Sequence, residues 1–106
     1  MISIEVECLC CEMDQDIKGK DLDPFPINVD TVEKCQKACQ IRQDCLSFAF
    51  NQNDKSKEKN YDGCWLKSIT LYDTEAQNLK EGTVNVTIGP KFCPGIYVVF
   101  PTLDLL

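Results

Sequence analysis

The sequence contains no histidine and no long apolar segment. The longest apolar run, residues 96–100, is far shorter than the roughly 20 residues that span a bilayer, so we expect no membrane insertion. Without histidine the chain cannot form an ordinary Ser/His or Cys/His catalytic pair, and it also lacks a glycine-rich phosphate loop. We therefore expect a protein that is not an enzyme and that needs no cofactor.

Basic residues are also scarce. Eleven lysines and arginines face 17 aspartates and glutamates, which gives a net charge of −6. Nucleic acids and heparin attract cationic surfaces, so we expect no nucleic-acid partner. The first residues lack the basic start and apolar block of a secretory signal, because Ile2, Ile4 and Val6 alternate with polar residues. We interpret the chain as a fragment of a longer secreted protein, or as one whose leader was removed.

Cysteine, in contrast, is abundant. Eight cysteines occur in 106 residues, an even number that is typical of small secreted domains held together by disulfides. This usage predicts an oxidising location, either in the secretory pathway or at the extracellular surface. Spacing alone does not decide which cysteines pair.

The hydrophobic patterns predict an α+β fold with one helix. Asp30 is expected to cap the helix together with Glu33, and the spacing places Cys35 and Cys39 on its buried face. Alternating residues predict strands over 1–10, 46–50, 64–68 and 83–88, the last with Val84, Val86 and Ile88 facing inward. Residues 12–30 are expected to form a connecting loop with a short strand near Ile17, and residues 51–63 an exposed hairpin loop.

Metal binding finds little support in the sequence. Asp14-x-Asp16-x-Lys18-Gly19 begins like a calcium loop, but a lysine stands at its fifth position and Phe25 at its twelfth. A zinc site is not expected because histidine is absent and disulfides account for the cysteines. A thiol oxidoreductase is the weakest functional alternative, since Cys35 and Cys39 are separated by three residues and lie inside the helix.

Several motifs together resemble the PAN/apple domain. They are Cys35-x-x-x-Cys39-x-x-x-x-x-Cys45-x-Ser47-Phe48-x-Phe50, Cys64-Trp65-Leu66-Lys67-Ser68 and Gly89-Pro90-Lys91-x-Cys93, preceded by a cysteine some eight residues before Gly19. The form that looks most similar is the apple-type module of apicomplexan micronemal adhesins and related lectins. The resemblance implies one helix packed on a twisted antiparallel sheet of about five strands. We expect the domain over 11–93, an N-terminal strand or extension over 1–10, and a tail or edge strand over 94–106.

The resemblance also implies disulfides. Carried onto this chain, they are Cys35 with Cys64, Cys39 with Cys45, and Cys11 with Cys93, where the neighbouring Cys10 could replace Cys11. The family pattern assigns no partner to the two remaining cysteines, Cys8 and Cys10. A bridge between these two would be strained, so a covalent link to a neighbouring module or second chain, or a free pair, is as plausible.

The resemblance implies a non-catalytic recognition module of an adhesin, and the sheet offers it a candidate site. If Cys64 and Leu66 face the helix, Trp65 and Lys67 face the opposite side, next to Tyr61 and Asp62. An aromatic plane beside charged groups suits a sugar, whereas the alternative is that Trp65 packs under a loop and Lys67 is solvated.

A concave pocket at these residues would favour carbohydrate, and a flat patch would favour a protein partner without sugar binding. Lectin members of the family bind galactose-type sugars, so the expected partner is a host or cell-surface glycan or protein. In addition, Asn85-Val86-Thr87 is an acceptor for N-linked glycan, and alternation predicts that Asn85 points outward.

Overall fold

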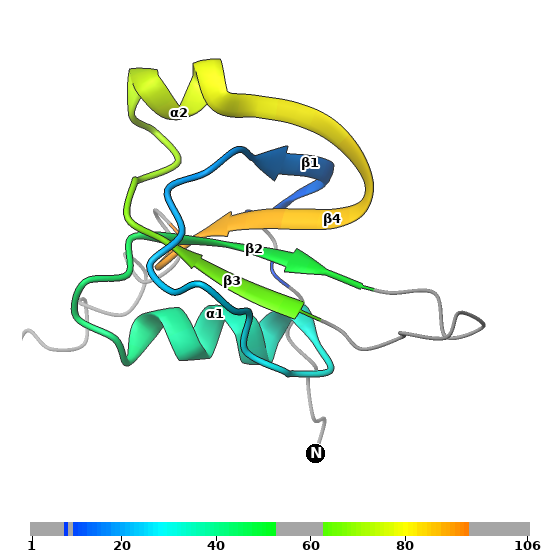
Figure 1. The fold of residues 1–106 in the computed structure, drawn as a ribbon, viewed down its shortest axis with the longest axis vertical. Coiled ribbons are helices and arrows are strands. Elements are labelled where there is room, and N and C mark those ends of the chain that lie inside the picture. The colour runs from blue at the N-terminus through cyan, green and yellow to red at the C-terminus, as the bar shows by residue number, and fades with distance from the viewer. Residues whose placement is uncertain (1–7, 9, 53–62, 94–106) are drawn as a thin grey trace, which may run out of the picture.

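The computed structural model describes residue 8 and residues 10–52 and 63–93 (Figure 1). Its elements follow the order β1 (Glu12–Ile17), α1 (Val32–Gln40), β2 (Ser47–Asn51), β3 (Gly63–Lys67), α2 (Thr74–Leu79) and β4 (Lys80–Pro90). The four strands form one antiparallel sheet in the order β1-β4-β2-β3. The α+β class is as predicted, but the described residues hold four strands, not about five, and two helices, not one. The strand expected over 1–10, the tail over 94–106 and most of the 51–63 loop lie outside them.

The first strand lies where the sequence predicted mainly a loop. Residues 12–17 are rich in acids, but within the described part of the chain β1 is an edge strand that pairs only with β4, so its outer side can hold charged groups in water. An irregularity in register falls between Met13 and Gln15, where Asp14 adopts a positive φ of 59°. The strand pattern is interrupted there, which hides it from a search for simple alternation.

Helix α1 begins one residue later than predicted. Thr31, in an extended conformation, is the N-cap, and its hydroxyl accepts a hydrogen bond from the backbone N–H of Lys34 at 3.1 Å. The Asp30 carboxylate instead forms an ion pair with the Lys34 ammonium at 2.9 Å, so the expected capping box of Asp30 and Glu33 is wrong. Cys35 and Cys39 are fully buried on the inner face, as predicted.

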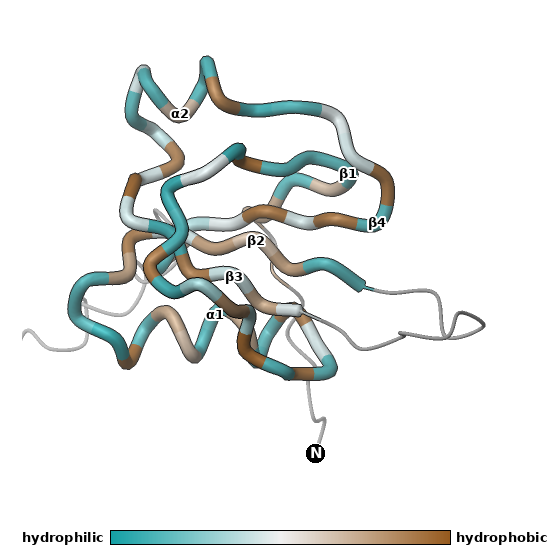
Figure 2. Tube along the Cα trace, in the orientation of Figure 1, coloured by the Kyte–Doolittle hydropathy of each residue, from teal (hydrophilic) through white to brown (hydrophobic). Residues whose placement is uncertain are grey.

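The sheet separates two hydrophobic clusters. The cluster on the α1 side contains Phe48, Phe50, Leu66 and four cysteines. The cluster on the other face contains Ile17, Ala49, Ile69, Leu71, Ala76, Val86 and Ile88, and half-buried Trp65 packs against it. Figure 2 shows the mostly apolar central strands between a largely hydrophilic α2 and the helix α1. The central strand β2 is therefore buried on both faces.

Strand β4 begins at α2 and curves back to lie between β1 and β2 (Figure 1). Its alternation does not hold throughout, because Asn85 adopts a positive φ of 69° and its N–H donates to the Asp14 carboxylate. Val86 and Ile88 are buried as predicted, but Val84 is 75% exposed, so its inward placement is wrong. Among the described residues, no helix is long and apolar enough to cross a membrane.

Candidate functional site

Two buried disulfides attach α1 to the sheet. Cys35 bonds to Cys64 in β3, and Cys39 bonds to Cys45, which lies just before β2. These are two of the pairs implied by the resemblance. All four side chains are at most 1% exposed. Because Cys35 and Cys39 are buried and bonded, neither provides the accessible thiol that an oxidoreductase requires.

The outer pairs differ from the expectation. Cys10, not Cys11, bonds to Cys93, and Cys11 bonds to Cys8. The two neighbouring cysteines lie in different surroundings, and the Cys11 sulfur is so close to Gly89 that a Cβ there would be 2.5 Å from it. Cys11 therefore packs against β4. All eight cysteines lie among the described residues and each is bonded within the chain, so neither the expected link of Cys8 or Cys10 to another chain nor a free pair is found. Sequence reasoning missed Cys8–Cys11, although its Cys-x-x-Cys spacing is visible.

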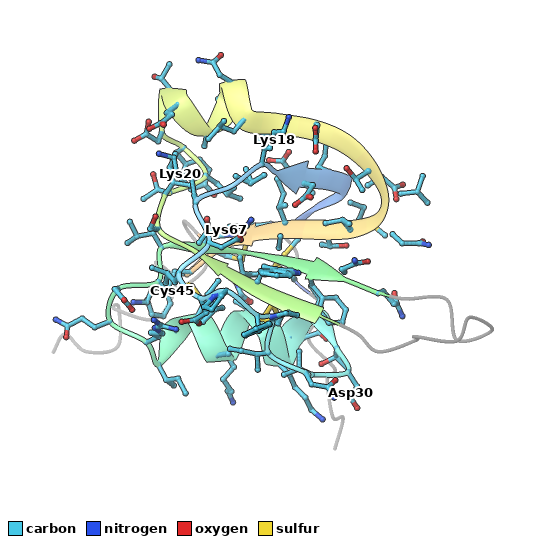
Figure 3. All side chains as sticks on the ribbon, viewed as in Figure 1. Lys18, Lys20, Asp30, Cys45 and Lys67 are labelled. Atoms are coloured by element: carbon cyan, nitrogen blue, oxygen red, sulfur yellow. A yellow bond between two sulfur atoms is a disulfide. The ribbon has the colours of Figure 1, made fainter. Side chains whose placement is uncertain are left out.

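Lys67 is buried, not solvated. Its side chain lies beneath the segment that follows β1 (Figure 3) and is 4% exposed. Its ammonium donates to the backbone carbonyls of Ile17 and Gly19, each at 2.9 Å, and to the Asp21 carboxylate at 2.6 Å. An ammonium has three hydrogens, and all three are used here. Lys67 thus stabilises the loop over residues 17–21, and its ammonium has no hydrogen left to donate to a ligand.

This loop forms part of the wall of a hollow of about 290 Å³. The hollow is lined by Asp16, Ile17, Lys18, Gly19, Asp21, Trp65, Lys67 and Glu81. Trp65 and Lys67, predicted from alternation in β3, therefore border one concave space. Tyr61 and Asp62, the other two predicted site residues, lie outside the described residues. The indole nitrogen of Trp65 lies near Gly63, 3.6 Å from the position that a Cβ would take there.

The acidic side of the hollow was missed by the sequence reasoning. Asp16 of β1 and Glu81 of β4 are cross-strand partners, so the sheet brings together residues 65 positions apart (81 − 16). In the sequence, Asp16 stands out only as part of a calcium-like loop. Its position opposite Glu81 depends on the β1–β4 register, which a loop over residues 12–30 does not predict.

A second cavity, of about 340 Å³, lies at the start of α1. Its walls include the Cys8–Cys11 disulfide, Val32, Glu33 and Phe50. Phe50 belongs to the cluster on the α1 side, whereas Ile17 and Trp65 of the first hollow border the other cluster. The two cavities thus occupy opposite sides of the sheet.

The glycan acceptor motif lies in β4. Asn85 is exposed, as its predicted outward direction requires, while Val86 is buried and Thr87 is partly buried. Attachment of a glycan needs an accessible asparagine amide, which this position provides. Glycosylation at Asn85 stays a prediction.

The PAN domain family model matches residues 15–67, half of the chain. The matched segment contains the end of β1, α1, β2 and β3, and thus both buried disulfides and Trp65. It excludes the four cysteines of the outer pairs. No curated protein and no solved structure matches the chain.

Proposed function

The chain belongs to the PAN domain family, and we propose that it is a carbohydrate-binding recognition module of a secreted or cell-surface adhesin. PAN domains are generally non-catalytic modules that bind protein or carbohydrate, and they are typically extracellular. Four disulfides in a short chain fit that location. The resemblance to apple-type modules of apicomplexan micronemal adhesins and lectins supports the adhesin role and a galactose-type ligand.

The hollow beside Trp65 is the observation that carries the proposal. Sugars bind through an apolar ring face, which stacks on an aromatic plane, and through hydroxyls that donate to carboxylates. Trp65 supplies the aromatic ring, and Asp16 and Glu81 are among the acidic residues that line the same hollow. A concave site of this composition favours a small polar ligand over a flat protein surface.

The charges of the hollow favour an uncharged sugar. The lining residues include three acids, Asp16, Asp21 and Glu81, and two lysines, Lys18 and Lys67, which leaves a charge of −1 (2 − 3). Lys67 is already paired with Asp21. Sulfated or sialylated glycans would meet repulsion here, and the net charge of −6 adds to it. A neutral galactose-type hexose is the proposed ligand.

Tryptophan fluorescence tests the site directly, because Trp65 is the single tryptophan of the chain. We expect galactose to change its emission in a saturable way, and Glu81→Gln to weaken binding by about tenfold through loss of a charged acceptor. The matched control is Glu75→Gln, an exposed carboxylate paired with Lys20 outside the hollow. Equal affinity of the two variants would place the sugar elsewhere.

Truncation of the aromatic ring gives an independent test. Trp65→Ala should weaken sugar binding by about 1 kcal/mol or more, in line with aromatic contact energies. Because Trp65 also packs against a hydrophobic cluster, Trp65→Phe serves as the variant that keeps part of this packing. Binding is then measured by calorimetry. A folded Trp65→Ala protein with unchanged affinity would contradict the proposal.

A protein partner without sugar binding is the second candidate. Large apolar side chains are exposed on β1 and β4, where Met13 is 74% and Val84 75% exposed. Exposed apolar groups of this kind mark protein contacts when they form a continuous patch. A glycan array run beside a pull-down from the target cell surface separates the two candidates: array binding supports the first, and specific protein capture with a blank array supports the second.

A further inference from the structure

The four outer cysteines form one group of sulfur atoms. The Sγ atoms of Cys8, Cys10 and Cys93 all lie within 4.8 Å of one another, although they belong to two different disulfides. The Cys8 and Cys10 sulfurs are 4.0 Å apart. All four outer cysteines are only partly buried, whereas the four inner ones are at most 1% exposed. Thiols from solution can therefore reach the outer pairs and not the inner ones.

We propose that an external monothiol exchanges with the Cys8–Cys11 disulfide. The Cys8 thiolate that is released then exchanges with the Cys10–Cys93 disulfide by attacking Cys93. Cys8 and Cys11 both line the 340 Å³ cavity, which gives a small thiol access to their sulfurs. The modification is stoichiometric and needs no low-pKa catalytic thiol in the resting protein. It is separate from sugar binding, because this cavity and the Trp65 hollow lie on opposite sides of the sheet.

The first step breaks the Cys8–Cys11 disulfide. The thiolate of the external monothiol attacks the Cys11 sulfur, a new bond forms between these two sulfurs, and the Cys8–Cys11 bond breaks. Cys8 leaves as a thiolate. The external thiol supplies the electron pair, its proton remains in solvent, and one mixed disulfide replaces one protein disulfide. No further oxidant or reductant is needed.

The second step exchanges the partner of Cys93. The Cys8 thiolate attacks the Cys93 sulfur, a Cys8–Cys93 bond forms, the Cys10–Cys93 bond breaks, and Cys10 takes up a proton from water. The alternative product, a bridge between Cys8 and Cys10, would span a single residue and be strained. Cys93 is positioned by Gln36, whose side-chain amide donates to the Pro90 carbonyl at 3.0 Å and lies 3.8 Å from the Cys93 sulfur.

The exchange changes the wall of the cavity but leaves the two ends of the domain joined by a disulfide. The Cys10–Cys93 bridge joins residues 83 positions apart, and a Cys8–Cys93 bridge would join residues 85 positions apart (93 − 8), so the two ends of the domain stay connected. The bond between Cys8 and Cys11 is lost, however, and both residues form part of the cavity wall. The external thiol therefore alters the wall of the α1-side cavity, while a disulfide to Cys93 still joins the two ends of the domain.

Differential alkylation of the whole chain tests the proposal. The folded protein is exposed to glutathione, free thiols are blocked with iodoacetamide, and the remaining cysteines are reduced and labelled with N-ethylmaleimide before peptide sequencing. We expect glutathione on Cys11 in a parallel unreduced sample, and about tenfold more iodoacetamide label on Cys10 than on Cys93. Cys35, Cys39, Cys45 and Cys64 are internal controls and should carry none.

The Cys8→Ser/Cys11→Ser double variant is the matched control. It lacks the Cys8 thiolate that attacks Cys93, and it keeps the Cys10–Cys93 disulfide. Cys10 should carry much less label in this variant at the same glutathione concentration, because only direct attack of glutathione on the Cys10–Cys93 bond remains. Equal label on Cys10 and Cys93 in the unchanged protein would mean simple reduction of the long bridge and would overturn the proposal. Label on Cys8 with none on Cys10 would also overturn it. Both outcomes are read in the unchanged chain, so they do not depend on folding of the variant.

Discussion

Replacement of Lys67 by methionine tests the interpretation of the Trp65 hollow. Lys67 is buried, and its ammonium is bonded to two carbonyls and to the Asp21 carboxylate. Removal of one partner of a buried ion pair costs about 3–5 kcal/mol, and each hydrogen bond to a charged group contributes about 1.5–3 kcal/mol. The Asp21 side chain is 35% exposed, so water compensates part of its loss. We expect a loss of about 3 kcal/mol in the free energy of unfolding.

Urea unfolding with the disulfides intact measures this loss. With a slope of about 1.5 kcal/mol per molar urea, the midpoint should fall by about 2 M. The matched control is Lys34→Met, in which the lost ion pair with Asp30 is exposed and should cost less than about 1 kcal/mol. If Lys67→Met lost sugar affinity but kept the stability of the Lys34→Met variant, Lys67 would be a direct ligand and the inferred supporting role would be wrong.

Three further substitutions test other parts of the fold. Gly89→Ala should lower the free energy of unfolding by about 2 kcal/mol, because its Cβ would clash with the Cys11 sulfur. Gly82→Ala, whose Cβ would make only an ordinary contact at 4.0 Å, serves as the control, and equal melting temperatures of the two variants in calorimetry would contradict this. Thr31→Ala should cost about 1 kcal/mol through loss of the helix cap, and Thr31→Ser should restore most of it in urea unfolding. Asn85→Gln should remove a glycan-sized mass from protein secreted by a eukaryotic host, and identical masses would exclude occupancy there.

Features set by local sequence were predicted well. The spacing of Cys35 and Cys39 places both on one helical face, and both are buried in the structure. The predicted strands at 46–50 and 64–68 differ from β2 and β3 by one residue at each end. Both inferences depend on side chains close together in the chain, for which the helical and strand periods are sufficient. The short helix α2 was missed because six residues give too little periodicity to detect.

Features set by distant contacts could not be predicted from the same patterns. Alternation correctly placed Lys67 on the face opposite α1, but its burial depends on a loop 46 to 50 residues earlier in the chain. Cys10 and Cys11 also differ in their distant neighbours, because only the Cys11 sulfur is among the atoms nearest to a Cβ at Gly89. Spacing treats adjacent cysteines as equivalent, although their side chains meet different neighbours in the folded chain.

The buried disulfides and the hollow are connected through a single strand. Cys64 is bonded to α1 through Cys35, so β3 is held with this side chain toward the helix. Successive side chains of a strand point to opposite faces, and Trp65 must therefore point away from α1. Lys67 lies two residues further on, on the same face as Trp65, and its ammonium fixes the loop that forms the opposite wall. The cysteines thus orient the aromatic side of the hollow from the other face of the sheet. A ligand bound there would meet a surface positioned before binding, which lowers the ordering cost of recognition.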